Sequence, residues 1–408
     1  LYLNGLTVLD ATAASGIADA SGRHLHLDGL RSLDVSTATA LAKREGESLS
    51  LDGLTSLDAS TARALSTWDQ SEYGWGGVHE LSLNGLASLS ADVAGALATW
   101  NGGSRLSLSG LTSVDAVTAA ALFNRNPDDG FRGELFLDGI TTLDAETARA
   151  FAAGTGSHLS LNGVRALDAE TAHALSGWAG SSLSLNGVTA LDTETARALA
   201  QQRGGHVFLN GITALDEETA RALSSLVGRR LTLNGIAALD AETARALSLL
   251  RVSDLSLDGV TALDAETARA LSSFAGTGLH LNGVTTLDAE TAFALSTWKM
   301  AKGRKSILYL NGVMALDTTT AYALSQWQGF RLDLNGLTSL DERTARGLAT
   351  WNGRYLFLNG VTTLDAATAT ALSSFNGDKI SLKGLVASGE PWAPLFEKCS
   401  CNVTFGPL

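Results

Sequence analysis

Two close pairs of residues in this sequence have side chains that bind metal ions or form covalent bonds: His24 with His26, and Cys399 with Cys401. One residue separates the two histidines, so on an extended strand both imidazoles would point to the same side. A zinc site needs a third and a fourth ligand, and the neighbouring sequence offers neither. We therefore expect ordinary exposed histidines, with no metal site and no cofactor.

The two cysteines are the only ones in the chain. Cysteines one residue apart bridge each other only with strain, so we expect free thiols or an intermolecular link. Two cysteines also make no disulfide framework. The sequon Asn402-Val403-Thr404 beside them is a weak signal for glycosylation.

Catalytic motifs are absent from the sequence. It contains no nucleophile elbow, phosphate-binding loop, HExxH or CxxC motif. The many aspartates have a different explanation, because most of them stand where helix caps are expected. The sequence therefore predicts a protein that is not an enzyme and has no catalytic residues.

Residues with the chemistry of a binding surface gather in the last third of the chain, between leucines. Exposed aromatic residues interleaved with arginine are typical of the energetic hot spots of protein interfaces. Aromatic residues also simply suit exposed strand positions, and this alternative stays open. The candidate binding residues are His280, Tyr309, Arg331, Asp333, Tyr355 and Phe357.

A second candidate surface lies in longer segments that interrupt the regular spacing. One contains Tyr73 and Trp75, and another, KMAKGRKS, contains Lys302 and Arg304. Such insertions emerge on one edge of a repeat array, where functional loops are often placed. The basic segment could meet an acidic partner, although a solvated loop is the simpler explanation.

These positions are set by a repeat that runs through the chain. Each unit of the repeat contains a glycine, and the residue before that glycine is here termed the anchor. There are sixteen anchors, and eleven of the fifteen intervals between them are 24 residues. In the unit LSLNGVTALDTETARALA, Leu183 and Leu185 alternate as in a short strand. Asp192 then stands at the N-cap of a helix. A fixed period with one strand and one helix indicates a solenoid.

The pair Asn186-Gly187 is the strongest short signal for a β-hairpin, but no returning strand follows it. We interpret the pair as the corner between strand and helix. The Asn, Asp or Ser makes a local bond from its side chain to the backbone, and the glycine supplies the backbone angle of the turn.

Two further columns of the repeat indicate packing. Alanine stands ten residues after the anchor in all sixteen units, which predicts a close approach of helix to sheet. Six of the eight tryptophans stand sixteen residues after an anchor, and this register favours packing at the helix end.

The unit resembles the leucine-rich repeat family, and is most similar to bacterial 24-residue repeats with GAxALA helices, written here as TAxAL(S/A). The resemblance covers about residues 1–384 and implies an α/β solenoid, with a curved parallel sheet inside and short helices outside. After Leu385 the pattern dissolves, which predicts an irregular C-terminal cap over residues 385–408. The family's buried asparagine has no counterpart, because Val188 and other apolar residues stand there, so its asparagine ladder is not expected to transfer.

Charge and hydropathy exclude some partners. The net charge of −13 disfavours nucleic acid, and no apolar run reaches the ~18 residues of a membrane span, so no membrane insertion is expected. The chain begins in mid-pattern with LYLNG. That open N-terminal end is expected to continue into further repeats or to contact a partner.

These observations favour a non-enzymatic recognition or scaffold solenoid that binds a protein, and less readily a glycan, on its concave strand face. The alternative is a structural component of a cell envelope or extracellular assembly, because the units between residues 138 and 300 are nearly identical. An adaptor role, by analogy with the GAxALA proteins, lacks a visible adaptor segment. A secreted or envelope location is favoured over a cytoplasmic one.

Overall fold

The computed structural model describes residues 1–19, 22–68, 79–100, 105–123, 133–203, 205–299, 305–386 and 391–407. Over these residues strands and helices alternate along the chain, as the repeat predicts. The residues divide into two compact units. Unit 1 comprises residues 1–191 and 201–208, and unit 2 comprises residues 192–200 and 209–408.

The described part of unit 1 holds parallel strands that lie side by side in chain order. The strands are β1 (His24–His26), β2 (Ser48–Ser50), β3 (Glu80–Ser82), β4 (Arg105–Ser107), β5 (Glu134–Phe136), β6 (His158–Ser160), β7 (Ser182–Ser184) and β8 (His206–Phe208). The helices are α1 (Ala11–Ala18), α2 (Val35–Leu41), α3 (Ala59–Leu65), α4 (Ala91–Ala98), α5 (Ala116–Phe123), α6 (Ala145–Ala152) and α7 (Ala169–Leu175).

Unit 2 repeats this arrangement. Its strands are β9 (Val227–Thr232), β10 (Arg251–Ser256), β11 (Gly278–His280), β12 (Ile307–Tyr309), β13 (Arg331–Asp333), β14 (Tyr355–Phe357), β15 (Lys379–Leu382) and β16 (Asn402–Phe405). Its helices are α8 (Thr193–Leu199), α9 (Glu217–Leu223), α10 (Ala241–Leu247), α11 (Ala265–Leu271), α12 (Ala289–Ser296), α13 (Thr318–Ser325), α14 (Glu342–Ala349) and α15 (Ala366–Leu372), with a 3-10 helix η2 (Ala393–Lys398) near the end.

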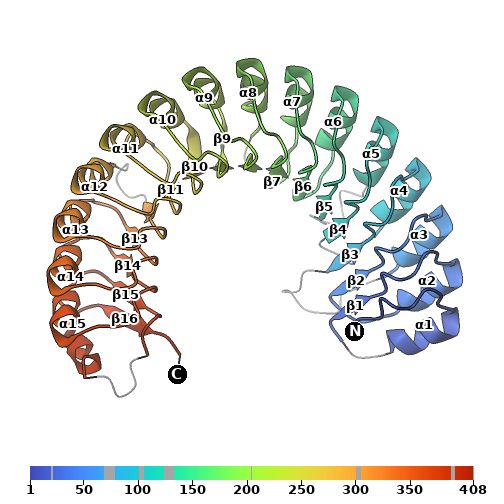
Figure 1. Cartoon of the computed structure of the whole chain (residues 1–408). Helices are drawn as coiled ribbons and strands as arrows, with labels where there is room; N and C mark the ends of the chain where they lie inside the picture. Colours follow the sequence, from blue (N-terminus) through green and yellow to red (C-terminus); the bar gives the residue numbers. More distant parts are fainter. Residues whose placement is uncertain are drawn as a thin grey trace. The chain divides into compact units, whose positions relative to one another are not determined.

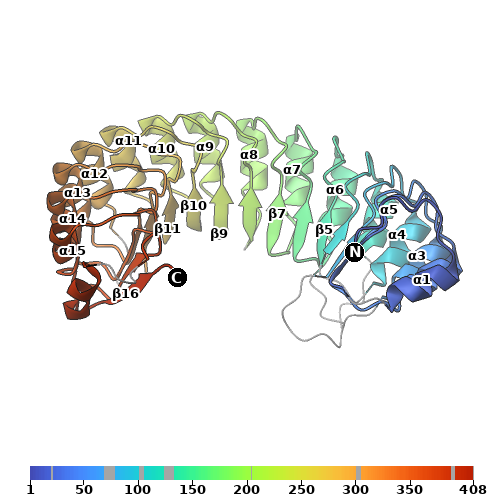
Figure 2. The same ribbon diagram turned by 60° about the horizontal axis from the view of Figure 1, so that its bottom comes forward.

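Within each unit the strands form one face and the helices the opposite face (Figure 1), and the turned view in Figure 2 shows the same two layers. Residues one repeat apart stand beside each other, as Leu159 and Leu183 do. Both leucines are fully buried, while the residue between Leu183 and Leu185 lies on the strand face. The predicted α/β solenoid of parallel strands and short helices is confirmed.

The helix columns of the repeat pack as predicted. The Asp192 side chain accepts a hydrogen bond from the Thr195 N–H at 2.7 Å and caps α8. Ala172 and Ala196 have no exposed surface, because each helix lies close to the sheet. The tryptophans at the helix ends are buried. Those of neighbouring repeats stack on each other, with ring centres 5.6 Å apart for Trp298 and Trp327.

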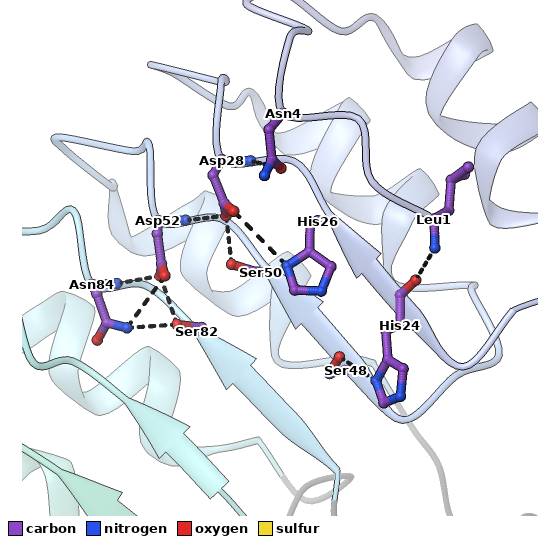
Figure 3. Close-up of polar contacts among 10 residues, drawn as sticks. All are labelled: Leu1, Asn4, His24, His26, Asp28, Ser48, Ser50, Asp52, Ser82 and Asn84. Carbon is purple, nitrogen blue, oxygen red and sulfur yellow. Dashed lines mark hydrogen bonds and ion pairs between the residues drawn. The ribbon is translucent and has the colours of Figure 1, made fainter.

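The interpretation of the anchor as a local turn-former is wrong. The Oδ1 atom of Asn162 accepts a hydrogen bond from the backbone N–H of Asn186, the anchor of the next repeat, at 2.9 Å. The same bond joins Asp28 to Asp52 and Asp52 to Asn84 (Figure 3). The chain therefore has its own ladder of Asn and Asp side chains, placed at the anchor.

The role assigned to the glycine is also wrong. Gly187 does not adopt a positive φ, so its freedom to take that angle is not used. A Cβ atom at this position would lie 2.1 Å from the carbonyl oxygen of Asn162 and 2.6 Å from that of Val164. Glycine is required because the corners of adjacent repeats stack too closely for any side chain.

The expectation that the two cysteines are free thiols or form an intermolecular link is wrong. Cys399 and Cys401 form a disulfide with each other. The strand that follows, β16, pairs in parallel with β15 and so extends the sheet of unit 2.

Candidate binding surface

The residue between the two leucines of each strand, here termed the middle residue, has one of two roles. Where it is serine, its hydroxyl completes the ladder: Ser184 donates to Asn162 Oδ1 at 2.7 Å. Seven serines donate in this way to the preceding anchor, namely Ser50, Ser82, Ser107, Ser160, Ser184, Ser256 and Ser381. These serines belong to the scaffold.

Where the middle residue is not serine, the ladder closes without it. Beside Tyr309, the Asn311 side chain donates directly to Asn282 Oδ1 at 2.8 Å. Beside Asp333, Asn335 donates to Asn311 Oδ1 at 2.8 Å. The aromatic and charged middle residues are therefore not needed by the scaffold.

The structure brings the six strand candidates onto four neighbouring strands of unit 2. Tyr309 stands beside Asp333, and Asp333 beside Phe357. Arg331 stands beside Tyr355. The name Arg331 cluster is used below for His280, Tyr309, Arg331, Asp333 and Phe357.

Arg331 is held from three sides. Its Nε and Nη2 atoms donate to the two carboxylate oxygens of Asp333, each at 2.7 Å. Its guanidinium carbon lies 4.0 Å from the ring centre of Phe357 and 5.7 Å from that of Tyr309. The hydrogen bonds to Asp333 raise the pKa of Arg331 above its ordinary value. Because Asp333 is only 2% exposed, it positions the arginine and is not itself open to a partner.

His280 supports the cluster at its other end. Its ring stacks on Tyr309 with ring centres 3.9 Å apart. Burial is the main cause that lowers the pKa of His280, with a further contribution from Arg230, while Asp258, Asp254 and Asp333 oppose the shift. The imidazole is therefore neutral at pH 7. Burial also raises the pKa of Tyr309, so its hydroxyl keeps its proton.

Tyr355 faces a second group of residues, of which the sequence analysis includes only Lys305, within the segment KMAKGRKS. Its ring meets Phe330 edge-on at 5.0 Å between ring centres. The Lys305 ammonium lies 5.0 Å from the Phe330 ring centre, and Arg354 pairs with Asp378 at 3.3 Å. Three members of this group, Lys305, Phe330 and Arg354, stand just before three consecutive strands. This shared position is the sequence signal that could have identified the group.

Unit 1 carries another aromatic cluster that sequence reasoning missed. Arg105 lies over Phe136, 4.8 Å from the ring centre, and pairs with Glu134 at 2.9 Å. Phe136 contacts His158 with ring centres 5.2 Å apart, and His158 contacts Phe208 at 6.4 Å. Burial lowers the pKa of His158. The sequence contains a signal for this cluster, because Phe136 and Phe208 are aromatic middle residues, as Tyr309 and Phe357 are.

The other candidates from the sequence are four loop residues and the histidine pair. Tyr73, Trp75, Lys302 and Arg304 lie outside the described residues. His24 shares a hydrogen bond with Ser48 at 2.9 Å, and His26 stacks on Tyr2 with ring centres 4.4 Å apart.

The described residues hold neither a metal-binding cluster nor a helix that could span a membrane. Among them, no three His, Cys, Asp or Glu side chains gather closely enough to hold a metal ion. None of the helices within the described ranges has both the length and the apolar character needed to cross a membrane.

Comparison with known proteins identifies the fold. No family model matches the chain, and no curated protein sequence matches it. Among solved structures, an internalin from Listeria monocytogenes is 14% identical over 86% of this chain and 95% of its own, with a TM-score of 0.45. The glycosylated Toll–Spatzle complex of Drosophila is 13% identical over 87% of this chain, with a TM-score of 0.52, and this chain spans 46% of that one. The fold is a leucine-rich-repeat solenoid.

Proposed function

We propose that this chain is a non-enzymatic recognition or scaffold solenoid that binds a protein through the strand face of unit 2. The observation that carries this proposal is the exchange of ladder serines for Tyr309, Asp333 and Phe357 on consecutive strands. These side chains add nothing to the ladder, which closes through Asn–Asn side-chain bonds beside Tyr309 and Asp333. Beside Phe357 it continues through the hydrogen bond from the Asn359 N–H to Asn335 Oδ1 at 2.9 Å. They form instead a connected aromatic and arginine surface, and such residues dominate the binding energy of protein interfaces.

The geometry of the cluster favours binding in a second way. Arg331 is fixed by Asp333 and two rings before any partner arrives, so its side chain loses little conformational freedom on binding. One matched solved structure is itself a complex, that of Toll with Spatzle. A protein ligand fits this surface better than a glycan, because its exposed groups combine aromatic rings with charged pairs.

We also propose that the repeats are of the bacterial 24-residue type with GAxALA helices. The support is the recurrent TAxAL helix, as in Thr195–Leu199, and the dominant interval of 24 residues.

The test of binding uses a triple variant, Tyr309→Ala, Tyr355→Ala and Phe357→Ala, which keeps the Arg331–Asp333 pair. The full chain is used to isolate a partner from the source cells, and the purified partner's affinity is then measured. We expect the triple variant to lose about a hundredfold in affinity with an unchanged far-UV circular dichroism spectrum.

The matched control changes three exposed residues of the helix layer in the same unit: Arg269→Ala, Phe293→Ala and Tyr322→Ala. Phe293 is 53% exposed and Tyr322 39% exposed, so their removal should leave the fold and the affinity unchanged. Full affinity in the strand-face variant, or an equal loss in the control, would contradict the proposal.

A structural role in a cell envelope or extracellular assembly is the second candidate. It is favoured by the near-identity of the repeats between residues 138 and 300. A chain that stays monomeric by light scattering at high concentration would argue against it.

A further inference from the structure

Two cations flank an aromatic ring across three neighbouring strands of unit 2. Arg331 on β13, Tyr355 on β14 and Lys379 on β15 stand beside one another in register. Adjacent strands are about 4.8 Å apart, so the backbone positions of the two cationic residues are separated by about 10 Å. The row runs across the strands, on the face that carries the Arg331 cluster.

Both cations have hydrogen-bond donors left over. Asp333 takes only the Nε and Nη2 atoms of Arg331, so Nη1 remains, and the Arg331 side chain is 32% exposed. Among the described residues, no ion pair involves the Lys379 ammonium. Lys379 is half-buried, so its ammonium is partly open to a partner.

The surface around this row is basic in an acidic protein. Its four cations are Lys305, Arg331, Arg354 and Lys379, and its two carboxylates are Asp333 and Asp378, which leaves two positive charges in excess. Both carboxylates are already paired with arginines of the same surface. The whole chain, by contrast, carries a net charge of −13. The surface is therefore complementary to an acidic ligand.

We propose that the protein partner inserts an acidic segment here, with two carboxylates about 10 Å apart and an apolar side chain between them. One carboxylate bonds the fixed guanidinium of Arg331, the apolar side chain lies on Tyr355, and the second carboxylate meets Lys379. A peptide in the polyproline II conformation has three residues per turn and advances about 3.1 Å per residue, so acidic residues three positions apart lie on one side of it, about 9 Å apart, and match this spacing. The inference rests on the proposed function and names the chemistry of its partner.

The test measures binding of the full chain to three synthetic, end-capped peptides. They repeat Glu-Ser-Phe, Gln-Ser-Phe or Lys-Ser-Phe. We expect the Glu peptide to bind about tenfold more tightly than the neutral Gln peptide, because its hydrogen bonds are charge-assisted. The advantage should shrink as salt is added. Equal binding of the Glu and Gln peptides, or tighter binding of the Lys peptide, would overturn the inference.

Variants locate the binding to the proposed row. Lys379→Gln removes a cation with no ion pair and should reduce the affinity for the Glu peptide several-fold, without changing that for the Gln peptide. Arg269→Gln makes the same charge change on the helix layer of unit 2 and should have no effect. Equal effects of the two variants would show only a response to net charge and would contradict the proposed row.

The same variants distinguish a failure of this inference from a failure of the proposed function. If the triple variant loses the isolated partner while Lys379→Gln binds it normally, the strand face is a binding surface but does not select carboxylates. If the triple variant also binds the partner normally, the proposed function fails with it.

Discussion

The Oδ1 atom of Asn162 lies 2.9 Å from the backbone nitrogen of Asn186, the residue one full repeat later. The same oxygen accepts a hydrogen bond from Ser184 at 2.7 Å. The Asn162 amide nitrogen in turn donates to Ser160 at 2.8 Å. One side chain thus joins the corners of two repeats, and this bond recurs along both units.

Removing the Asn162 side chain should lower the free energy of unfolding strongly. Asn162→Ala leaves the Asn186 N–H and the Ser184 hydroxyl without their partner, and each unsatisfied, partly buried group costs about 1–3 kcal/mol. Asn162→Asp should be much milder, because Asp138 fills the same position one repeat earlier. Urea unfolding followed by circular dichroism measures both. Equal midpoints for the two variants would contradict this account of the ladder.

Gly187→Ala should be severely destabilising, because the new Cβ atom would lie 2.1 Å from the Asn162 carbonyl oxygen. Backbone atoms of two repeats would have to separate to admit it. Gly95→Ala is the matched control, since a Cβ atom there meets nothing within 4 Å. Gly95 lies inside α4, so alanine should stabilise that helix by up to about 1 kcal/mol. Thermal unfolding should show midpoints that move in opposite directions, and a tolerated Gly187→Ala would refute the close-stacking explanation.

Asp264→Ala removes the N-cap of α11, where the carboxylate accepts from the Thr267 N–H at 2.8 Å. The expected loss in free energy of unfolding is about 1 kcal/mol. Asp264→Asn keeps an oxygen that can cap the helix and should retain most of the stability. Amide hydrogen exchange in the first turn of α11 provides a local readout, and unchanged exchange in the Ala variant would count against a capping role.

Acid should weaken the fold through the caps acting together. A side-chain hydrogen bond from Ser60, followed by the Thr61 backbone N–H, lowers the pKa of Asp58 from 3.8 to about 2. The backbone N–H of the third helical residue also lowers the pKa of Asp168 and Asp288. Because the unfolded chain then binds protons more readily than the folded one, stability is fully present above about pH 4 and is lost as the pH falls toward 2. The urea midpoint should follow this course, with a smaller slope for Asp264→Asn, and a midpoint constant down to pH 2 would contradict it.

The sequence predicts the fold well because its signals recur in register. Leu183, Asp192 and Ala196 each occupy a column whose period identifies strand, cap and core, and the structure places all three accordingly. The sequence predicts the wrong roles for Asn186 and Gly187 for a physical reason. Both depend on the repeat before them, whereas turn rules consider only adjacent residues.

The binding surface was only partly predictable. The alternation of side chains along a strand places Tyr309, Arg331 and Phe357 on one face. The hydrogen bonds from Arg331 to Asp333, however, depend on side-chain rotamers that no sequence pattern specifies. The sequence does not single out Phe330 and Arg354, because they precede the strands and lack a repeat signature. The Cys399–Cys401 disulfide is not predicted from the sequence, because the strain expected between cysteines one residue apart argues against it.

The exchange of serine for an aromatic middle residue has a consequence for how the strand surface of such a protein can evolve. Since Asn311 bonds Asn282 directly beside Tyr309, a mutation at the middle position alters the outward chemistry of one strand while the stacking of repeats persists. New ligand preferences can therefore arise one codon at a time. The surface could be retargeted in the same way, by changing the middle residues that are not ladder serines and leaving every anchor unchanged.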